Sequence, residues 1–188
     1  MMRIITGSAR GTRLKTLEGD NTRPTAERVK EAVFSMIQFE IEGRRILDLF
    51  AGSGQMGLEA LSRGAERAVF VDSSREACDI IKYNISKTHF EKKSTVRCTD
   101  YAAYIRTAPG NEKFDIVFVD PPYDAHLAAR ALSKLASSDL LSDTAIIVME
   151  TGSEPDTEEY GQFEVSKTAR YAKTTHITIL RKKVADYE

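Results

Sequence analysis

The sequence has no tryptophan, two cysteines and three histidines among its 188 residues. Cys78 and Cys98 are too few and too far apart in the chain for a disulfide framework or a cysteine metal site, so we expect two reduced thiols. His89, His126 and His176 have neither metal-ligand spacing nor the spacing of a Ser-His triad. The sequence therefore gives no indication of a bound metal or of serine nucleophile chemistry.

The chain also lacks the long apolar run of about 18 residues that a membrane helix needs. Residues 1–7 do not resemble a signal peptide, because no long apolar segment follows their charge. We therefore expect a cytoplasmic protein that does not bind membranes. Its length, with 41% hydrophobic and 29% charged residues, is ordinary for one globular domain with a sizeable core.

The formal net charge is only −1, but charges of opposite sign are separated along the chain. Residues 1–30 contain seven Lys or Arg against three Asp or Glu, whereas residues 150–160 contain five acidic residues and no basic one. A basic amino-terminal region next to a net acidic remainder is compatible with a local contact to an anionic partner.

From residue 45 onward, short β-type runs alternate with helical patterns, which predicts repeated βαβ units. Strands are expected over 46–50, 68–72, 95–98, 114–119 and 145–149, with helices over 55–63, 75–87, 101–106 and 125–137. The strand runs are apolar without alternation, as in a parallel sheet that is buried on both faces. Residues 162–169 and 175–180 lie too close together for a crossover helix, so they predict an antiparallel hairpin.

The predicted fold class is therefore α/β, a Rossmann-like sheet of five parallel strands plus a carboxyl-terminal antiparallel hairpin. This strand count resembles the seven-stranded sheet of S-adenosylmethionine-dependent methyltransferases. Before it, residues 3–7 and 12–16 can pair as two short strands, and apolar residues at helical spacing predict a helix over 26–39. We expect two parts: a basic extension over 1–44 and the main domain over 45–188.

A glycine-rich segment follows the first predicted strand. Gly52, Gly54 and Gly57 match G-x-G-x-x-G between a strand and a helix, and Asp72 lies 20 residues after Gly52. This arrangement also occurs in dinucleotide enzymes, where the acidic residue binds the ribose. The glycines alone therefore leave NAD and S-adenosylmethionine both possible.

Two acidic positions favour S-adenosylmethionine. Asp48 precedes the glycines, where a carboxylate would attract a cationic ligand and repel a pyrophosphate. Asp100 and Tyr101 end the third strand, where the carboxylate and a backbone N–H could bind an adenine ring. The predicted cofactor contacts are Asp48, Phe50, Ala51, Gly52, Ser53, Gly54, Asp72, Ser73, Asp100 and Tyr101.

The most informative segment is Asp120-Pro121-Pro122-Tyr123, directly after the apolar run 114–119. An exocyclic amino group of a base is a poor nucleophile, because its lone pair is delocalised into the ring. Asp120 can accept one of its N–H hydrogens and the Pro121 carbonyl the other, while the prolines fix the turn and Tyr123 stacks on the base. These four residues are the predicted catalytic set. An ordinary strand-end turn would use Asp and Pro too.

On these residues the chain resembles the RsmD family, bacterial methyltransferases that act on the N2 amino group of a guanine in 16S ribosomal RNA. The resemblance is carried by residues 3–7 with 10–11, by 22–34, by the glycine loop within 47–65, and by 120–123. The block 22–34 is the more specific signal, since amino-methyltransferases of DNA and RNA generally share the glycine loop and the Asp-Pro-Pro-Tyr segment. The resemblance implies S-adenosylmethionine as cofactor and 16S rRNA as partner. We expect the rRNA to be bound within an assembling 30S subunit and the enzyme to be monomeric.

The basic extension agrees with an RNA substrate, because Lys and Arg contact phosphates without reading sequence. The predicted RNA contacts are Arg10, Arg13, Lys15, Arg23, Thr25, Arg28 and Lys30. Three other interpretations stay open: an adenine-N6 methyltransferase acting on DNA or RNA, an NAD-dependent dehydrogenase, and a noncatalytic RNA-binding module. A solvated charged surface would also account for the basic residues.

Overall fold

The structure is a computed structural model that describes residues 2–17, 24–122, 125–152, 160–171 and 175–183. The strands are β1 (Arg45–Asp48), β2 (Arg67–Asp72), β3 (Ser94–Cys98), β4 (Phe114–Val119), β5 (Leu141–Thr151), β6 (Phe163–Tyr171) and β7 (Thr175–Lys182). The helices are α1 (Pro24–Met36), α2 (Gln55–Ser62), α3 (Arg75–Thr88), the 3₁₀ turn η1 (Glu91–Lys93), α4 (Tyr101–Thr107) and α5 (Ala125–Ala136).

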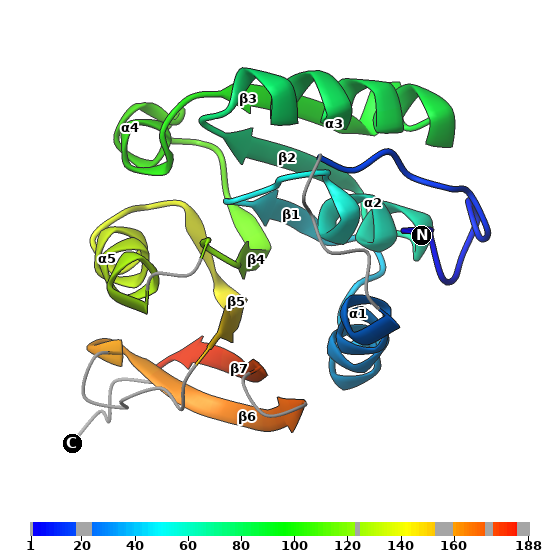
Figure 1. Cartoon of the computed structure of the whole chain (residues 1–188). Helices are drawn as coiled ribbons and strands as arrows, with labels where there is room; N and C mark the ends of the chain where they lie inside the picture. Colours follow the sequence, from blue (N-terminus) through cyan, green and yellow to red (C-terminus); the bar gives the residue numbers. More distant parts are fainter. Residues whose placement is uncertain (1, 18–23, 123–124, 153–159, 172–174, 184–188) are drawn as a thin grey trace.

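The seven strands form one sheet in the order β3-β2-β1-β4-β5-β7-β6. The first five are parallel, and β7 pairs antiparallel with both β5 and β6. The predicted fold class is confirmed, including the carboxyl-terminal hairpin. After β5 the chain first forms β6 at the edge of the sheet and then returns as β7, which lies between β5 and β6 (Figure 1).

Two hydrophobic clusters cover the two faces of the sheet because successive strand residues point to opposite sides. Ile46 belongs to the cluster under α1, α2 and α3, whereas its neighbour Leu47 belongs to the cluster under α4 and α5. All six residues of β4 are buried, which explains why its sequence shows no polar alternation. Figure 1 shows the two groups of helices on opposite sides of the sheet.

The amino-terminal arm, residues 2–17, crosses over α2 and α3 before α1 begins. The two short strands expected there are reduced to one antiparallel bridge between Arg3 and Arg13, supported by the Ile4 N–H donating to the Thr12 carbonyl at 2.9 Å. Ile4 and Leu14 of the arm are buried in the same cluster as Ile46 of the sheet. The proposed division at residue 44 stays a prediction, and helix α1 ends at Met36, three residues earlier than expected.

Candidate active site

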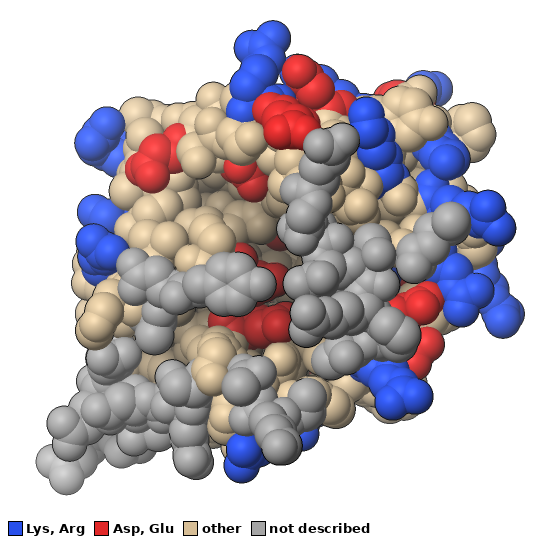
Figure 2. All heavy atoms as spheres, viewed as in Figure 1, with Lys and Arg blue, Asp and Glu red and all other residues tan. Residues whose placement is uncertain are grey.

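Four aspartates follow four adjacent strands at one edge of the sheet. Asp48 ends β1 and Asp72 ends β2, while Asp100 comes shortly after β3 and Asp120 directly after β4. Because these strands are parallel neighbours, their carboxyl ends lie at the same edge, where open α/β sheets bind ligands. Figure 2 shows a hollow over the ends of β1 and β4, with acidic side chains on its floor.

The glycine loop makes a tight turn between β1 and α2. Gly52 and Gly54 adopt positive φ angles of 53° and 78°, a region that non-glycine residues rarely occupy. A Cβ on Gly57 would lie 2.3 Å from Cε1 of Phe70, so only glycine lets α2 pack this closely on β2. A Cβ on Gly52 would meet no atom within 4 Å, so the loop is open to a ligand there.

Asp48 is buried under the start of α2. Its side chain is 3% exposed, and its Oδ2 accepts a hydrogen bond of 3.1 Å from the Gly57 N–H. Burial raises the pKa of Asp48 to about 7; the Gly57 hydrogen bond opposes that rise and the charge of Asp72 adds to it. The carboxyl group can therefore change its charge near neutral pH, which matters for a cationic ligand. Direct contact between Asp48 and a ligand stays a prediction.

Asp72 and Asp100 hold the loops around them. Asp72 accepts hydrogen bonds from the Gly52 N–H at 2.9 Å and the Ser74 N–H at 2.8 Å, one on each carboxylate oxygen. Asp100 caps α4, its Oδ1 accepting from the Ala102 and Ala103 N–H groups at 2.9 and 3.1 Å. Backbone N–H groups therefore already orient both side chains. The ribose contact predicted for Asp72 and the adenine contact predicted for Asp100 would use carboxylates held in this way.

Two aromatic rings from the predicted cofactor set meet at this edge. The centroids of Phe50, after β1, and Tyr101, at the start of α4, lie 5.1 Å apart with their planes tilted by 40°. Both side chains are half-buried. A planar adenine ring would fit against such an apolar surface, beside Asp72 and Asp100. Ala51 and Ser53 are buried in the same loop, and Ser73 is exposed next to Asp72.

The predicted catalytic segment leaves β4 next to the glycine loop. The Leu49 N–H donates to the Phe118 carbonyl at 3.1 Å, which joins the ends of β1 and β4. After this contact, Asp120 and Pro122 are exposed and Pro121 is buried. The Asp120 residue is therefore accessible at the carboxyl-terminal edge of the sheet, and the buried Pro121 anchors the turn. Tyr123 lies outside the described residues.

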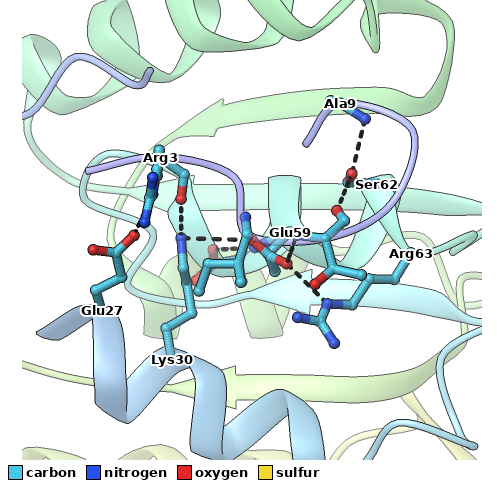
Figure 3. Close-up of polar contacts among 11 residues, drawn as sticks. Arg3, Ala9, Glu27, Lys30, Glu59, Ser62 and Arg63 are labelled. Atoms are coloured by element: carbon cyan, nitrogen blue, oxygen red, sulfur yellow. Dashed lines mark hydrogen bonds and ion pairs between the residues drawn. The ribbon is translucent and has the colours of Figure 1, made fainter. Parts of the chain in front are cut away.

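The basic extension is docked on α2 by Glu59, a contact that the sequence interpretation missed (Figure 3). The Glu59 carboxylate accepts hydrogen bonds from the Ile5 N–H at 2.8 Å, the Thr6 N–H at 3.0 Å and the Arg63 Nε–H at 2.8 Å. Ser62 adds a second anchor, since its Oγ accepts from the Ala9 N–H at 3.0 Å and donates to the Thr6 carbonyl.

One predicted RNA contact is wrong. Lys30 is 1% exposed, its Nζ donating to the Arg3 carbonyl at 2.6 Å and lying 3.6 Å from Oε2 of Glu59. An ammonium held in this way cannot reach a phosphate, so Lys30 has a structural role. The prediction grouped Lys30 with the other basic residues of the amino-terminal region. Residue 30 instead lies on the buried side of α1, together with Val29 and Val33.

The other basic residues differ in what the structure shows of them. Arg10, Arg13, Lys15 and Arg28 are exposed and stay predicted RNA contacts. Arg23 lies outside the described residues, and Thr25 is in α1 but its side chain is not described.

Asn84 is a second residue that the sequence interpretation missed. It is fully buried, and its amide donates to the carbonyls of Lys15 at 2.8 Å and Ser53 at 2.9 Å while its Oδ1 accepts from the Lys15 N–H at 2.8 Å. Asn84 thus joins the arm to the glycine loop. The available signal was an asparagine on the apolar stripe of α3, in line with Ile80, Ile81 and Ile85.

The strand order, the glycine loop after β1 and the Asp-Pro-Pro segment after β4 together define a Rossmann-like methyltransferase. Residues 2–180 match the model of the family described as conserved hypothetical protein 95. The chain belongs to this family, the RsmD methyltransferases.

Relatives of known name or structure agree with this family. The chain is 36% identical to YlbH of Bacillus subtilis, named a candidate rRNA methyltransferase, over 97% of this chain and 100% of that one. It is 34% identical to ribosomal RNA small subunit methyltransferase D of Haemophilus influenzae, covering 80% and 78% of the two chains. The solved structure of yhhF from Escherichia coli, a candidate methyltransferase, superposes with a TM-score of 0.84 at 29% identity, covering 97% and 98%.

Within the described ranges, no helix is long and apolar enough to cross a membrane.

Proposed function

We propose that this methyltransferase transfers a methyl group from S-adenosylmethionine to the N2 amino group of a guanine in 16S rRNA. The observation that carries the proposal is the position of Asp120, which follows β4 beside the glycine loop of β1, in a relative of small-subunit rRNA methyltransferases. The same position would suit an adenine amino group, so base identity is part of the test. A ribosomal substrate implies a cytoplasmic enzyme.

The residues at the sheet edge fit the cofactor. S-adenosylmethionine supplies a methyl group made electrophilic by a positively charged sulfur. Asp72 gives the edge a negative charge that suits such a ligand, and Asp48, whose pKa is about 7, adds to it when it loses its proton near neutral pH. The Phe50 and Tyr101 rings offer an apolar surface for adenine, and Gly52 leaves space for close approach. Asp72 would contact the ribose and Asp100 the adenine amino group.

The catalytic residues would act on the base. Asp120 accepts one N–H of the amino group and the Pro121 carbonyl accepts the other, so that the nitrogen lone pair points at the methyl carbon. With the cofactor bound, the N–C bond would form as the C–S bond breaks, the cofactor would leave as a neutral thioether, and the nitrogen would lose a proton to Asp120 or to water. Such a reaction depends mostly on positioning, which can contribute roughly 7–11 kcal/mol in favourable cases.

The experiment is methylation of bacterial 30S subunits that lack the modification, followed by nucleoside analysis. We expect N2-methylguanosine from the wild-type enzyme, a loss of turnover of at least about 100-fold for Asp120→Ala, which removes the acceptor, and S-adenosylmethionine affinity close to wild type. Asp143→Ala, which truncates an exposed aspartate on β5, is the matched control. N6-methyladenosine as product, or full turnover of Asp120→Ala, would contradict the proposal.

Two further comparisons complete the test of the substrate and cofactor. Subunits, mature 16S rRNA and free RNA compared in the same assay identify the substrate form, for which we propose the assembling subunit. Calorimetric titration with S-adenosylmethionine and with NAD distinguishes the two cofactors, and sedimentation tests the proposed monomer.

A further inference from the structure

Tyr83 is an exposed aromatic residue of α3 with two lysines near its ring, one from α3 and one from the amino-terminal arm. Its side chain is 53% exposed on α3. Nζ of Lys87, one turn further along α3, lies 5.8 Å from the ring centroid, and Nζ of Lys15, from the arm, lies 6.0 Å from it. Both lysines are themselves exposed. These distances are near the outer limit of a cation–π contact, so each ammonium can still turn to an external anion.

The buried Asn84 fixes the position of Lys15 relative to Tyr83. Asn84, the next residue of α3, binds both main-chain polar groups of Lys15, at 2.8 Å each, and the carbonyl of Ser53 at 2.9 Å. The backbone of Lys15 is therefore positioned against α3, and its side chain extends over Tyr83. The same amide connects this surface to the glycine loop, so ring and loop belong to one packed unit.

An aromatic ring with flanking lysines has the chemistry of a single-stranded nucleic-acid contact. Bases of any type stack on an exposed ring, and the ammonium groups bind the phosphates on either side of the stacked base. The surroundings have the matching charge: Figure 2 shows Lys and Arg gathered over the arm and the end of α3, away from the acidic hollow. Arg10 and Arg13 of the arm are exposed there as well.

We infer that Tyr83, Lys15 and Lys87 form a second RNA contact, separate from the catalytic pocket, in which an unpaired base stacks on Tyr83 and its flanking phosphates bind the two lysines. The inference rests on the proposed function, because it requires an RNA substrate. It adds a base-stacking contact to the RNA contacts predicted from the basic residues of the amino-terminal region.

The test measures binding of a fluorescein-labelled, mixed-sequence single-stranded RNA of about 12 nucleotides to the full chain. Tyr83→Ala should raise the Kd at least about fivefold, whereas Tyr83→Phe, which keeps the ring, should leave it unchanged. Lys15→Ala and Lys87→Ala should each reduce the slope of log K against log salt by about 0.7. Affinity for S-adenosylmethionine should not change in any of these variants.

Controls come from elsewhere on the molecule. Phe39→Ala removes a ring that is 94% exposed after α1, and Lys134→Ala removes an exposed lysine on α5; neither should alter the Kd. Unchanged RNA binding by Tyr83→Ala, or an equal loss for Phe39→Ala, would overturn the inference, as would failure of the wild-type chain to bind the RNA.

Failure of the proposed function would look different. It would appear as absence of N2-methylguanosine from the wild-type reaction, whatever Tyr83→Ala does to RNA affinity. The inference alone fails when the wild-type enzyme methylates guanine and binds the RNA, and Tyr83→Ala binds it equally well.

Discussion

Lys30 and Glu59 form an ion pair in the interior, with 3.6 Å between Nζ and Oε2 and with side chains that are 1% and 0% exposed. Burial lowers the pKa of Lys30, and the nearby Glu59 carboxylate opposes that change. The pair joins α1 to α2, and the remaining acceptor positions of Glu59 bind the arm. Glu59 of α2 therefore contacts both α1 and the arm of the basic extension, in addition to the Ser62 anchor.

Glu59→Gln should destabilise the protein far more than loss of a surface ion pair. The substitution leaves the Lys30 charge buried without compensation, which typically costs about 3–5 kcal/mol. Lys30→Met should cost less, because Glu59 keeps the Ile5, Thr6 and Arg63 donors. Urea denaturation gives the free energies of unfolding.

The matched control for that measurement is Glu40→Gln. It breaks the partly exposed pair with Arg181, 2.7 Å long, and should cost about 1 kcal/mol or less. A Glu59→Gln cost no greater than that of Glu40→Gln would contradict the role assigned to the buried pair.

Gly7→Ala should loosen the arm, whereas Gly11→Ala should not. Both glycines have positive φ, 87° and 84°, so both substitutions carry a backbone cost of about 1–2 kcal/mol. Only at position 7 would the new Cβ meet the protein, 1.8 Å from the Ser62 carbonyl oxygen; at Gly11 nothing lies within 4 Å. Hydrogen exchange of the arm amides distinguishes the two, and equal protection in both variants would refute the close docking.

Asp48 should make the apoprotein less stable as the pH rises. Its pKa is about 7 in the folded chain against an ordinary 3.8, so between about pH 4 and 7 the folded state holds a proton that the unfolded state has lost. This stabilisation is complete below about pH 4 and is lost as the pH rises through 7. From pH 5 to 8 the loss is on the order of 3 kcal/mol.

Asp48→Asn removes this titration and still accepts from the Gly57 N–H. Its free energy of unfolding, measured by urea denaturation at several pH values, should vary less between pH 5 and 8 than that of the wild type. Asp79→Asn, an exposed aspartate of α3, should keep the wild-type pH dependence. Parallel curves for wild type and Asp48→Asn would show that the group does not titrate in this range.

Asn84→Ala should destabilise the contact between the arm and the glycine loop. It leaves the buried Ser53 carbonyl without its partner, at about 1–3 kcal/mol, and the partly buried backbone groups of Lys15 without theirs, at a smaller cost for each. Ser86→Ala, an exposed position of the same helix, is the control. Thermal unfolding measures the cost, and a melting temperature equal to that of Ser86→Ala would exclude the proposed link.

Prediction from sequence was most successful where a repeated pattern carried the signal. The central strands were identified because burial on both faces leaves uninterrupted Val, Ile and Phe runs, and the final hairpin because too few residues separate its two strands for a crossover helix. Helix ends were less accurate, as α1 shows, since the apolar spacing continues past Met36 to residue 37 and Ile37 is buried beyond the helix. The short strands of the arm were also overestimated, because only Arg3 and Arg13 form a bridge among its described residues.

The order of strands and helices in the sequence was sufficient to place Asp48, Asp72, Asp100 and Asp120 at one edge of the sheet. Parallel strands bring their carboxyl ends together independently of how the side chains pack. Which polar residues are buried depends instead on contacts between segments distant in the chain. Lys30 meets Glu59 across 29 positions and Asn84 meets Lys15 across 69, and no local pattern encodes such pairings. A charge that looked available to RNA is therefore internal, and an asparagine that looked ordinary joins the arm to the glycine loop.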